Sequence, residues 1–254
     1  MGMTPKLIFA EKPQKKVIVF SHERSGTHFL MNTLAENFGY ITNSWVNLDL
    51  ELGVHFYSPH IFHQMFQQLH DKPVLNIFKS HHSFAFVENF IEYLTDQFHV
   101  FYVYRDPRDV MVSFRRILEK YDWDRGPKAA TVGEFMRAEP LGDILRYQKR
   151  QMPTILHRWV SHVEGWIDCQ ERLGKDKVFS VYYDDLDTRF NATVQDIGKH
   201  IDHPITSAKR PEREHNVISP GKGGSTHHKI LVPEDYEFVK EVAGKTMERL
   251  GILW

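Results

Sequence analysis

The feature that most constrains this chain is one stretch near its N-terminus, residues 17–30, which reads VIVFSHERSGTHFL. Its first four residues are apolar and mostly β-branched, which favours a buried strand. Small polar residues and one glycine follow, and apolar side chains then recur at helical spacing, at Leu30, Leu34 and Phe38. The stretch therefore predicts a strand, a tight turn and the start of a helix, in that order.

The predicted turn has the composition of an anion-binding loop. A helix N-terminus presents unpaired backbone N–H groups and partial positive charge, which suit a phosphate or sulfate group. Ser25 and Thr27 add hydroxyl donors, Gly26 lets an anion approach the backbone, and Arg24 adds a fixed charge. An ordinary strand-to-helix turn that binds nothing has a similar local pattern. The functional interpretation therefore depends on the segments that follow.

Size, charge and cysteine content narrow the class of protein. The chain has 254 residues, 41% of them hydrophobic, and no linker or internal repeat divides it, so we expect a single domain over residues 1–254. Its net charge of −1 argues against a nucleic-acid partner. Cys169 is the single cysteine, and neither a signal peptide nor a long apolar run is present. We therefore expect a cytoplasmic protein without a transmembrane segment, whose oligomeric state the sequence leaves open.

Short apolar runs alternate with helical patterns along the chain. The runs that favour strands are Val17–Phe20, Val74–Phe78, Phe98–Tyr104 and Val178–Tyr182. The helical patterns cover Thr27–Phe38, Ile61–Leu69, Phe84–Thr95, Pro107–Lys120, Thr131–Arg137, Ile155–Leu173, Leu186–Ile201 and Pro233–Leu250. Thr131 and Glu134 have the spacing of a capping box. This alternation predicts a three-layer α/β fold with a mainly parallel central sheet, in which ligands bind at the carboxyl ends of the strands.

Polar residues suited to an anionic ligand follow each predicted strand after the first. Lys79-Ser80-His81-His82 follows the second strand, and Arg105 follows the third strand, eight residues before Ser113. Tyr183-Asp184-Asp185 follows the fourth strand. Farther on, residues 219–225 form a glycine-rich segment whose Lys222 would reach an anion if the segment closed over it. Each cluster alone is also typical of a solvated surface, and only their common position after strands favours a site.

Taken in order, these motifs resemble those of the cytosolic-type sulfotransferases, which use 3′-phosphoadenosine-5′-phosphosulfate (PAPS). Glu23–Phe29 resembles the family's 5′-phosphosulfate loop, roughly Pro-Lys-Ser-Gly-Thr-Thr-Trp, and Lys79-Ser80-His81 matches its Lys-Thr/Ser-His element. Arg105 through Ser113 matches the 3′-phosphate pattern Arg-x-x-x-Asp-Val-x-Val-Ser at every fixed place. Tyr183-Asp184-Asp185 is similar to a Tyr-Glu-Asp element, and Gly221-Lys222-Gly223 keeps part of an Arg-Lys-Gly loop.

The resemblance implies a sulfotransferase fold similar to that of P-loop nucleotide-binding proteins. It implies transfer of the sulfuryl group from PAPS to a hydroxyl or amine of a small-molecule, lipid or sugar acceptor, with no metal required. His81 would be the general base, since imidazole accepts a proton near neutral pH, and Lys79 and Arg24 would stabilise the leaving phosphate. The nucleotide-binding set that the resemblance implies is Arg24, Ser25, Gly26, Thr27, His28, Phe29, Arg105, Ser113, Tyr183, Lys222 and Gly223.

Three positions depart from the family's pattern. Arg24 stands where the family has a lysine that contacts the bridging oxygen of the leaving phosphate, so the charge is kept but not the compact geometry. Phe29 replaces the tryptophan that stacks on adenine, and Gly221 replaces an arginine that binds the 3′-phosphate. His28 and His82 are adjacent competitors of His81, which we favour because it alone has the family's spacing.

Two other functions remain open at this point. One is a nucleotide kinase, although the chain has no Gly-x-x-x-x-Gly-Lys-Ser/Thr loop. The other is a non-catalytic relative that binds adenosine 3′,5′-bisphosphate (PAP). The acceptor is not identified either. Aromatic residues between Trp45 and Leu69, together with Tyr121 and Trp123, suit an apolar pocket, but aromatics more often fill a core.

Overall fold

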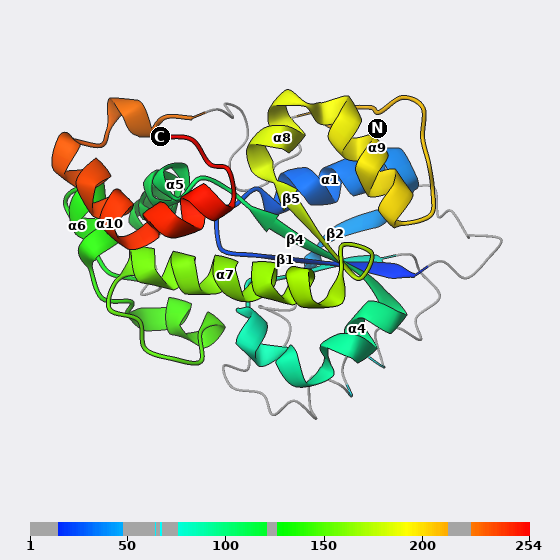
Figure 1. Ribbon diagram of the computed structural model, residues 1–254, viewed down its shortest axis with the longest axis horizontal. Coiled ribbons are helices and arrows are strands. Elements are labelled where there is room, and N and C mark those ends of the chain that lie inside the picture. Colours follow the sequence, from blue (N-terminus) through cyan, green and yellow to red (C-terminus); the bar gives the residue numbers. More distant parts are fainter. Residues whose placement is uncertain (1–14, 48–63, 65–66, 68–75, 121–125, 213–224) are drawn as a thin grey trace.

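A parallel five-stranded sheet forms the centre of the molecule (Figure 1). The computed structural model describes residues 15–47, 64, 67, 76–120, 126–212 and 225–254. The strands are β1 (Lys16–Ser21), β2 (Ile41–Asn47), β3 (Asn76–Ser80), β4 (Phe98–Tyr104) and β5 (Val178–Tyr182), in the spatial order β2-β3-β1-β4-β5. Each pairing between these strands is parallel, so the predicted sheet is confirmed.

Helices cover both faces of the sheet, which gives the predicted three layers (Figure 1). One face carries α1 (Thr27–Phe38), α8 (Tyr183–Thr188) and α9 (Phe190–His200). The other face carries α4 (Ile91–Gln97), α5 (Pro107–Lys120), α6 (Val132–Arg137), α7 (Ile155–Leu173) and α10 (Pro233–Arg249).

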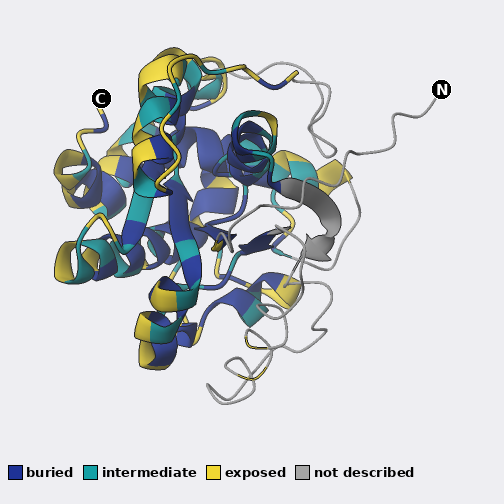
Figure 2. Ribbon diagram, turned by 90° about the vertical axis from the view of Figure 1, so that its right-hand side faces the viewer, coloured by how far each residue is buried: buried dark blue, intermediate teal, exposed yellow. Residues whose placement is uncertain are grey.

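The central strand supplies both hydrophobic cores, because successive side chains of a strand point to opposite faces. Val17 and Val19 of β1 pack in the core under α1 and α9. Ile18 and Phe20 pack in the larger core under α4, α5, α7 and α10. All four side chains are essentially inaccessible to solvent, and Figure 2 shows buried strand residues, in dark blue, between the helical layers. This double burial explains why β1 reads as a continuous apolar run and not as an alternating pattern.

Several predicted elements have the observed bounds, and others are wrong in an informative way. The helices at 27–38, 107–120 and 155–173 and the strands at 98–104 and 178–182 are confirmed, as is the capping box of Thr131 with Glu134. The helix predicted over Phe84–Thr95 begins instead as two 3₁₀ turns, η1 (Phe84–Phe86) and η2 (Glu88–Phe90), ahead of α4. The helix predicted over Leu186–Ile201 is two helices, because the backbone leaves the helical conformation at Arg189 (φ −114°, ψ 36°).

Strand β2 is absent from the prediction because its sequence, ITNSWVN, alternates too weakly in polarity. It lies at the edge of the sheet, where polar residues are tolerated. Two further 3₁₀ turns, η3 (Gly142–Tyr147) and η5 (His227–Lys229), also lacked a signal. Most of the helix predicted over Ile61–Leu69 lies outside the described residues. In the part of the chain that the structure describes, no helix is both long and apolar enough to cross a membrane.

The strand order fixes where a ligand can bind. β1 lies between β3 and β4. After β1 the chain forms β2 and β3 on one side of it, and then crosses to form β4 and β5 on the other side. The register pairs Phe20 with Ser80 and Ser21 with Val103, so the segments that follow β1, β3 and β4 leave the sheet at the same edge. Such a point in an open parallel sheet opens a crevice for ligands.

Candidate active site

The loop between β1 and α1 is shaped to receive an anion. Arg24 and Gly26 both adopt left-handed backbone conformations, with φ of 67° and 100°. Alternation of this kind turns successive backbone N–H groups toward one concave point. Ser25, between them, is fully buried, and its hydroxyl has no hydrogen-bond partner among the described residues. Left-handed backbone at a non-glycine residue together with an orphaned hydroxyl fits a loop that is completed by a bound phosphate or sulfate.

Tyr183 covers this loop from the end of β5. A Cβ atom on Gly26 would overlap the Tyr183 ring, so the close approach requires glycine at that position. The guanidinium carbon of Arg105 lies 4.3 Å from the centroid of the same ring. The fold thus brings together three predicted nucleotide-binding residues from the ends of three different strands.

His81 is held in the tautomer that a general base requires. Its Nδ1 lies 3.0 Å from the carbonyl oxygen of Ser21, which can only accept a hydrogen bond, so Nδ1 carries the proton. Its Nε2 lies 3.3 Å from Nζ of Lys79, which donates to it. The ring is therefore anchored through Nδ1, while the basic Nε2 faces Lys79, the predicted catalytic lysine. Ser21 also hydrogen bonds Thr27 between hydroxyl oxygens 2.6 Å apart, which links β1 to the first residue of α1.

The neighbouring His82 is buried and packed among other side chains. Its side chain is 2% exposed, and its Nδ1 lies 2.8 Å from Oγ of Ser80. Its ring packs against Phe86 and Tyr147, with centroid distances of 4.8 and 5.3 Å. His82 is thus a ring packed between aromatic side chains.

The charges around His28 describe the electrostatics of the site. Burial, together with the nearby Lys79, His81 and Arg24, lowers the pKa of His28 to about 3. His28 is therefore neutral and lies in a positive potential that would attract an anion. Arg24 also reaches across the site, because its Nε donates a 2.9 Å hydrogen bond to Oγ of Ser113 in α5.

A buried ion pair supports the loop from below. Both Nη atoms of Arg158 in α7 donate to the Glu23 carboxylate, at 2.8 and 2.9 Å. This pairing outweighs the cost of burial and lowers the pKa of Glu23 to about 2. Arg158 also donates to Nε2 of His22, whose pKa burial lowers to about 4. Glu23 and His22 are thus fixed in the charged and the neutral state respectively.

Helix α7 also holds the segment that carries the base. His162 donates from Nε2 to the carbonyl oxygen of His81 at 3.1 Å, and its Nδ1 accepts from the hydroxyl of Tyr102 at 3.0 Å. One turn farther along, Trp166 donates to the carbonyl oxygen of His82 at 3.3 Å. Arg158, His162 and Trp166 share one face of α7 because they are spaced by four residues. That spacing was readable in the sequence, but it does not reveal what the face contacts.

The segment after β4 carries the predicted 3′-phosphate residues. Arg105 pairs with Asp109 one helical turn later, at 3.5 Å. Asp109 is 3% exposed and accepts hydrogen bonds from the backbone N–H groups of Thr226 and His227, at 2.9 and 3.3 Å. It thus ties the C-terminal part of the chain to this edge of the sheet. Lys222 and Gly223 lie outside the described residues, as do Tyr121 and Trp123.

Phe29, the predicted adenine-stacking residue, lies in a cluster of aromatic side chains. It is 8% exposed, stacks on Phe190 with centroids 6.1 Å apart and meets Tyr183 edge-on. The Arg210 guanidinium lies over its ring, 5.1 Å from the centroid. Adenine stacking by Phe29 stays a prediction.

Comparisons with known proteins agree with this geometry. Residues 14–220 match the family model described as "Sulfotransferase domain". The fold is similar to that of mouse sulfotransferase SULT7A1, solved with PAP, with a TM-score of 0.60 and 14% identity over 94% of this chain and 85% of that one. It is also similar to retinol dehydratase, solved with retinol and PAP, with a TM-score of 0.59 and 15% identity over 94% and 82% of the two chains. A search of curated protein sequences gave no match.

The family match covers far more than half of the chain and includes the loop after β1, the segments after β3 and β4, and Tyr183. The structural similarities independently confirm the fold that the resemblance implied. The chain belongs to the sulfotransferase-domain family.

Proposed function

We propose that this protein transfers the sulfuryl group of PAPS to a hydroxyl or amine of a small acceptor, with His81 as the general base. Membership of the family makes the chain a PAPS-dependent sulfotransferase. The acceptor and the roles of individual residues are our proposal. The observation that carries it is the fixed tautomer of His81, whose basic Nε2 faces Lys79 beside the anion-binding loop.

His81 takes the proton of the acceptor through Nε2. Lys79 must first release this nitrogen, and a phosphosulfate in the loop is a stronger partner for an ammonium group than a neutral imidazole. Binding of the donor would therefore expose the base. As the acceptor oxygen or nitrogen bonds to sulfur, the bond from sulfur to the bridging oxygen breaks and PAP leaves. The charge that develops on the leaving phosphate is stabilised by Arg24 and Lys79.

The chain's own groups suit the phosphosulfate end of the donor. The left-handed residues Arg24 and Gly26 turn backbone N–H groups inward, and the buried Ser25 hydroxyl lacks a partner among the described residues. Thr27 begins α1, so the partial positive charge of a helix N-terminus adds to that of the side chains. Hydroxyl, backbone and cationic donors thus converge without a metal, and metal independence stays part of the proposal.

Recognition of the 3′-phosphate distinguishes the donor from other adenine nucleotides. We assign it to Arg105 and Ser113, with Lys222 as a third contact from outside the described residues. A phosphate dianion is costly to desolvate unless several donors converge on it, so these groups would reject a nucleotide that lacks it. The same arrangement disfavours a nucleotide kinase, which has no use for a 3′-phosphate site.

The acceptor class is the least constrained part of the proposal. Retinol dehydratase, one of the proteins with a similar fold, has been solved in complex with retinol and with androsterone, both small apolar alcohols. We propose that the acceptor is an alcohol of this general size, a class that includes hydroxylated lipids and sugars. The aromatic residues that suit either an apolar pocket or a core lie outside the described residues or, at Trp45, in a strand described by its backbone alone.

Two measurements test the proposed function. Incubation with ³⁵S-labelled PAPS and a panel of alcohols, phenols, sugars and amines should give a sulfated product without added magnesium. In a thermal-shift series, PAP should raise the melting temperature much more than AMP or ATP at matched concentration. Arg105→Ala should remove most of that difference.

Each alternative function has its own outcome. Equal shifts from AMP and PAP, or a preference for ATP, would contradict the donor assignment and favour the kinase. A strong PAP shift without any sulfated product would favour the non-catalytic relative.

A further inference from the structure

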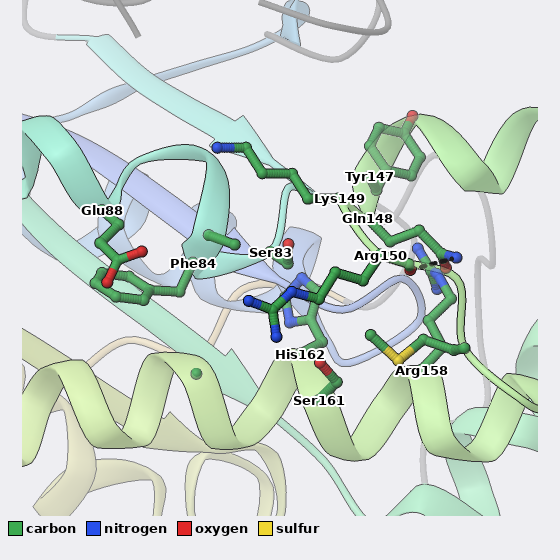
Figure 3. A pocket seen from close by; sticks show the side chains of 13 residues that line it. Ser83, Phe84, Glu88, Tyr147, Gln148, Lys149, Arg150, Arg158, Ser161 and His162 are labelled. Carbon is green, nitrogen blue, oxygen red and sulfur yellow. Dashed lines mark hydrogen bonds between the residues drawn. The ribbon is translucent and has the colours of Figure 1, made fainter.

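A cavity lies beside the candidate active site, between η1, the chain that follows η3 and one face of α7 (Figure 3). Its volume is about 220 Å³. This is several times the roughly 30 Å³ that a water molecule takes up in the liquid, and below the roughly 300 Å³ at which drug-sized sites begin. Arg24, Lys79 and His81 do not line it. The cavity therefore suits a small occupant that does not reach the transferring atoms.

Two buried polar atoms at one end of the cavity have no partner among the described residues. Arg158 is 2% exposed, and its Nη atoms are taken by Glu23 and His22, but its Nε is unbonded. Gln148 is 7% exposed and donates from Nε2 to the carbonyl of Arg150, while its Oε1 is unbonded. Figure 3 shows the side chains of Gln148 and Arg158 next to each other at this end.

A hydroxyl group of a ligand can satisfy both atoms of this pair. Nε of Arg158 can only donate a hydrogen bond and Oε1 of Gln148 can only accept one, whereas a hydroxyl oxygen accepts and its proton donates. Unpaired buried groups of this kind are rare in folded proteins, so their coincidence in one cavity points to an occupant. A carboxylate or phosphate alone would satisfy Arg158 but would leave the Gln148 oxygen facing another acceptor.

The rim of the cavity favours a negative charge. Lys149 and Arg150 are exposed residues of the lining, and Nζ of Lys149 lies 5.5 Å from the centroid of the Phe86 ring. Figure 3 shows the Arg150 side chain extending toward His162. Glu88 lies at the opposite end, so the rim carries one more positive than negative charge. The charge of Arg158 is balanced by Glu23. Phe84 and Met152 add apolar wall for a carbon skeleton.

We propose that this cavity binds a small hydroxylated anion, a molecule of the size of a sugar acid or sugar phosphate, with a hydroxyl between Arg158 and Gln148 and its charge at Arg150 and Lys149. The two sources of charge, carboxylate and phosphate, share this chemistry. The proposal does not depend on the proposed function. It places a second ligand against Arg158, the residue that holds the loop through Glu23.

Calorimetric titration of the full chain at low ionic strength tests the site. The ligands are glucuronate, glucose 6-phosphate and glucose, which share hydroxyls and differ in charge. We expect saturable binding of at least one anion. Glucose should bind at least roughly tenfold more weakly than that anion, since a charge-assisted contact contributes about that factor. The better anion identifies which source of charge the site takes.

Single variants that leave the proposed catalytic residues unchanged test the site and supply a control. Arg150→Gln and Gln148→Leu should each weaken binding of the preferred anion by about tenfold, whereas Lys175→Gln, an exposed lysine beyond the end of α7, should not. The thermal shift with PAP should be unchanged in all three variants. Absence of saturable binding for both anions, equal binding of glucose, or unchanged affinity in Arg150→Gln would each overturn the proposal.

Discussion

The two halves of the candidate active site are held in different ways. On the transfer side, which follows β1 and β3, the loop and the base are supported from behind by α7. Arg158 pairs with Glu23 at 2.8 Å, and His162 donates to the His81 carbonyl at 3.1 Å. On the nucleotide side, which follows β4 and β5, Arg105 pairs with Asp109 at 3.5 Å and stacks on Tyr183.

This difference matches what each half has to do. Chemistry requires a base and cations whose positions are fixed before the reaction, because reorganisation during transfer raises the barrier. Ligand binding requires residues that exchange one partner for another. Arg105 and Asp109 share one contact at 3.5 Å, whereas Arg158 and Glu23 share two hydrogen bonds of 2.8 and 2.9 Å. The Arg105–Asp109 pair is therefore the easier of the two to exchange for contacts with a ligand.

The largest expected effect lies on the transfer side, at the base. His81→Ala should lower kcat by roughly 100- to 10,000-fold, while the affinity for PAP changes little. His82→Ala is the matched control and should lower kcat much less, because its ring is packed against Phe86 and Tyr147. Initial rates with labelled PAPS and calorimetric PAP binding measure both. Equal losses of kcat at the two positions would remove His81 from this role.

The second effect concerns the support beneath the loop. Arg158→Met leaves the Glu23 carboxylate buried without its partner, which should lower the free energy of unfolding by about 3–5 kcal/mol. Glu23→Gln combined with Arg158→Met removes both charges and should recover much of that loss. Urea denaturation of the single and double variants measures the coupling. A double variant no more stable than Arg158→Met would show that the pair is not what stabilises the loop.

The sequence predicted the layers of the fold and most of the groups at the edge of the sheet. Continuous apolar runs identified β1, β4 and β5, and residues placed after strands identified Arg24, His81 and Arg105. The strand predictions are confirmed because a strand buried on both faces has a local signature, and the candidate groups lie after those strands as expected. Their roles stay predictions. The family's motifs added roles that spacing alone does not give.

The support beneath the site could not be predicted in the same way. Arg158 and Glu23 are 135 residues apart in the chain, and His162 and the His81 carbonyl are 81 apart. No local pattern encodes such contacts, and a buried arginine reads as a surface residue in sequence. The edge strand β2 was missed because an edge position relaxes the requirement for apolar residues.

A smaller effect is expected in the pH dependence of the protein's stability, through His22 on the transfer side. His22 is fully buried with a pKa lowered to about 4, against about 6.5 in the unfolded chain. As the pH falls from 6.5 toward 4, the unfolded chain binds a proton that the folded protein does not, so stability is lost by up to roughly 1.4 kcal/mol per pH unit. His22→Gln should reduce this dependence by about one proton between pH 6 and 5. Urea titrations at both pH values measure it, and identical slopes for His22→Gln and the unmodified protein would contradict the assignment.

The smallest effect is expected where the two sides meet. Arg24 belongs to the loop, yet its Nε donates to Ser113 of α5 at 2.9 Å, so it connects the transfer side with the nucleotide side. Arg24→Lys keeps the charge near the leaving phosphate, and the backbone donors of the loop already hold the anion. We expect kcat within roughly tenfold of the unmodified protein, since one hydrogen bond contributes about that factor.

Two further variants separate the effect of the Arg24 charge from that of its hydrogen bond to Ser113. Arg24→Ala removes both and should lower kcat much more than Arg24→Lys, whereas Ser113→Ala removes only the connection and should mainly weaken PAP binding. Single-turnover rates at saturating PAPS, with PAP affinity measured separately, distinguish the two. If Arg24→Lys is as damaging as Arg24→Ala, the two-pronged geometry of the guanidinium is what matters, and the two sides are coupled more tightly than their hydrogen bonds suggest. If Arg24→Ala leaves kcat unchanged, Arg24 does not touch the reacting groups, and Lys79 alone stabilises the leaving phosphate.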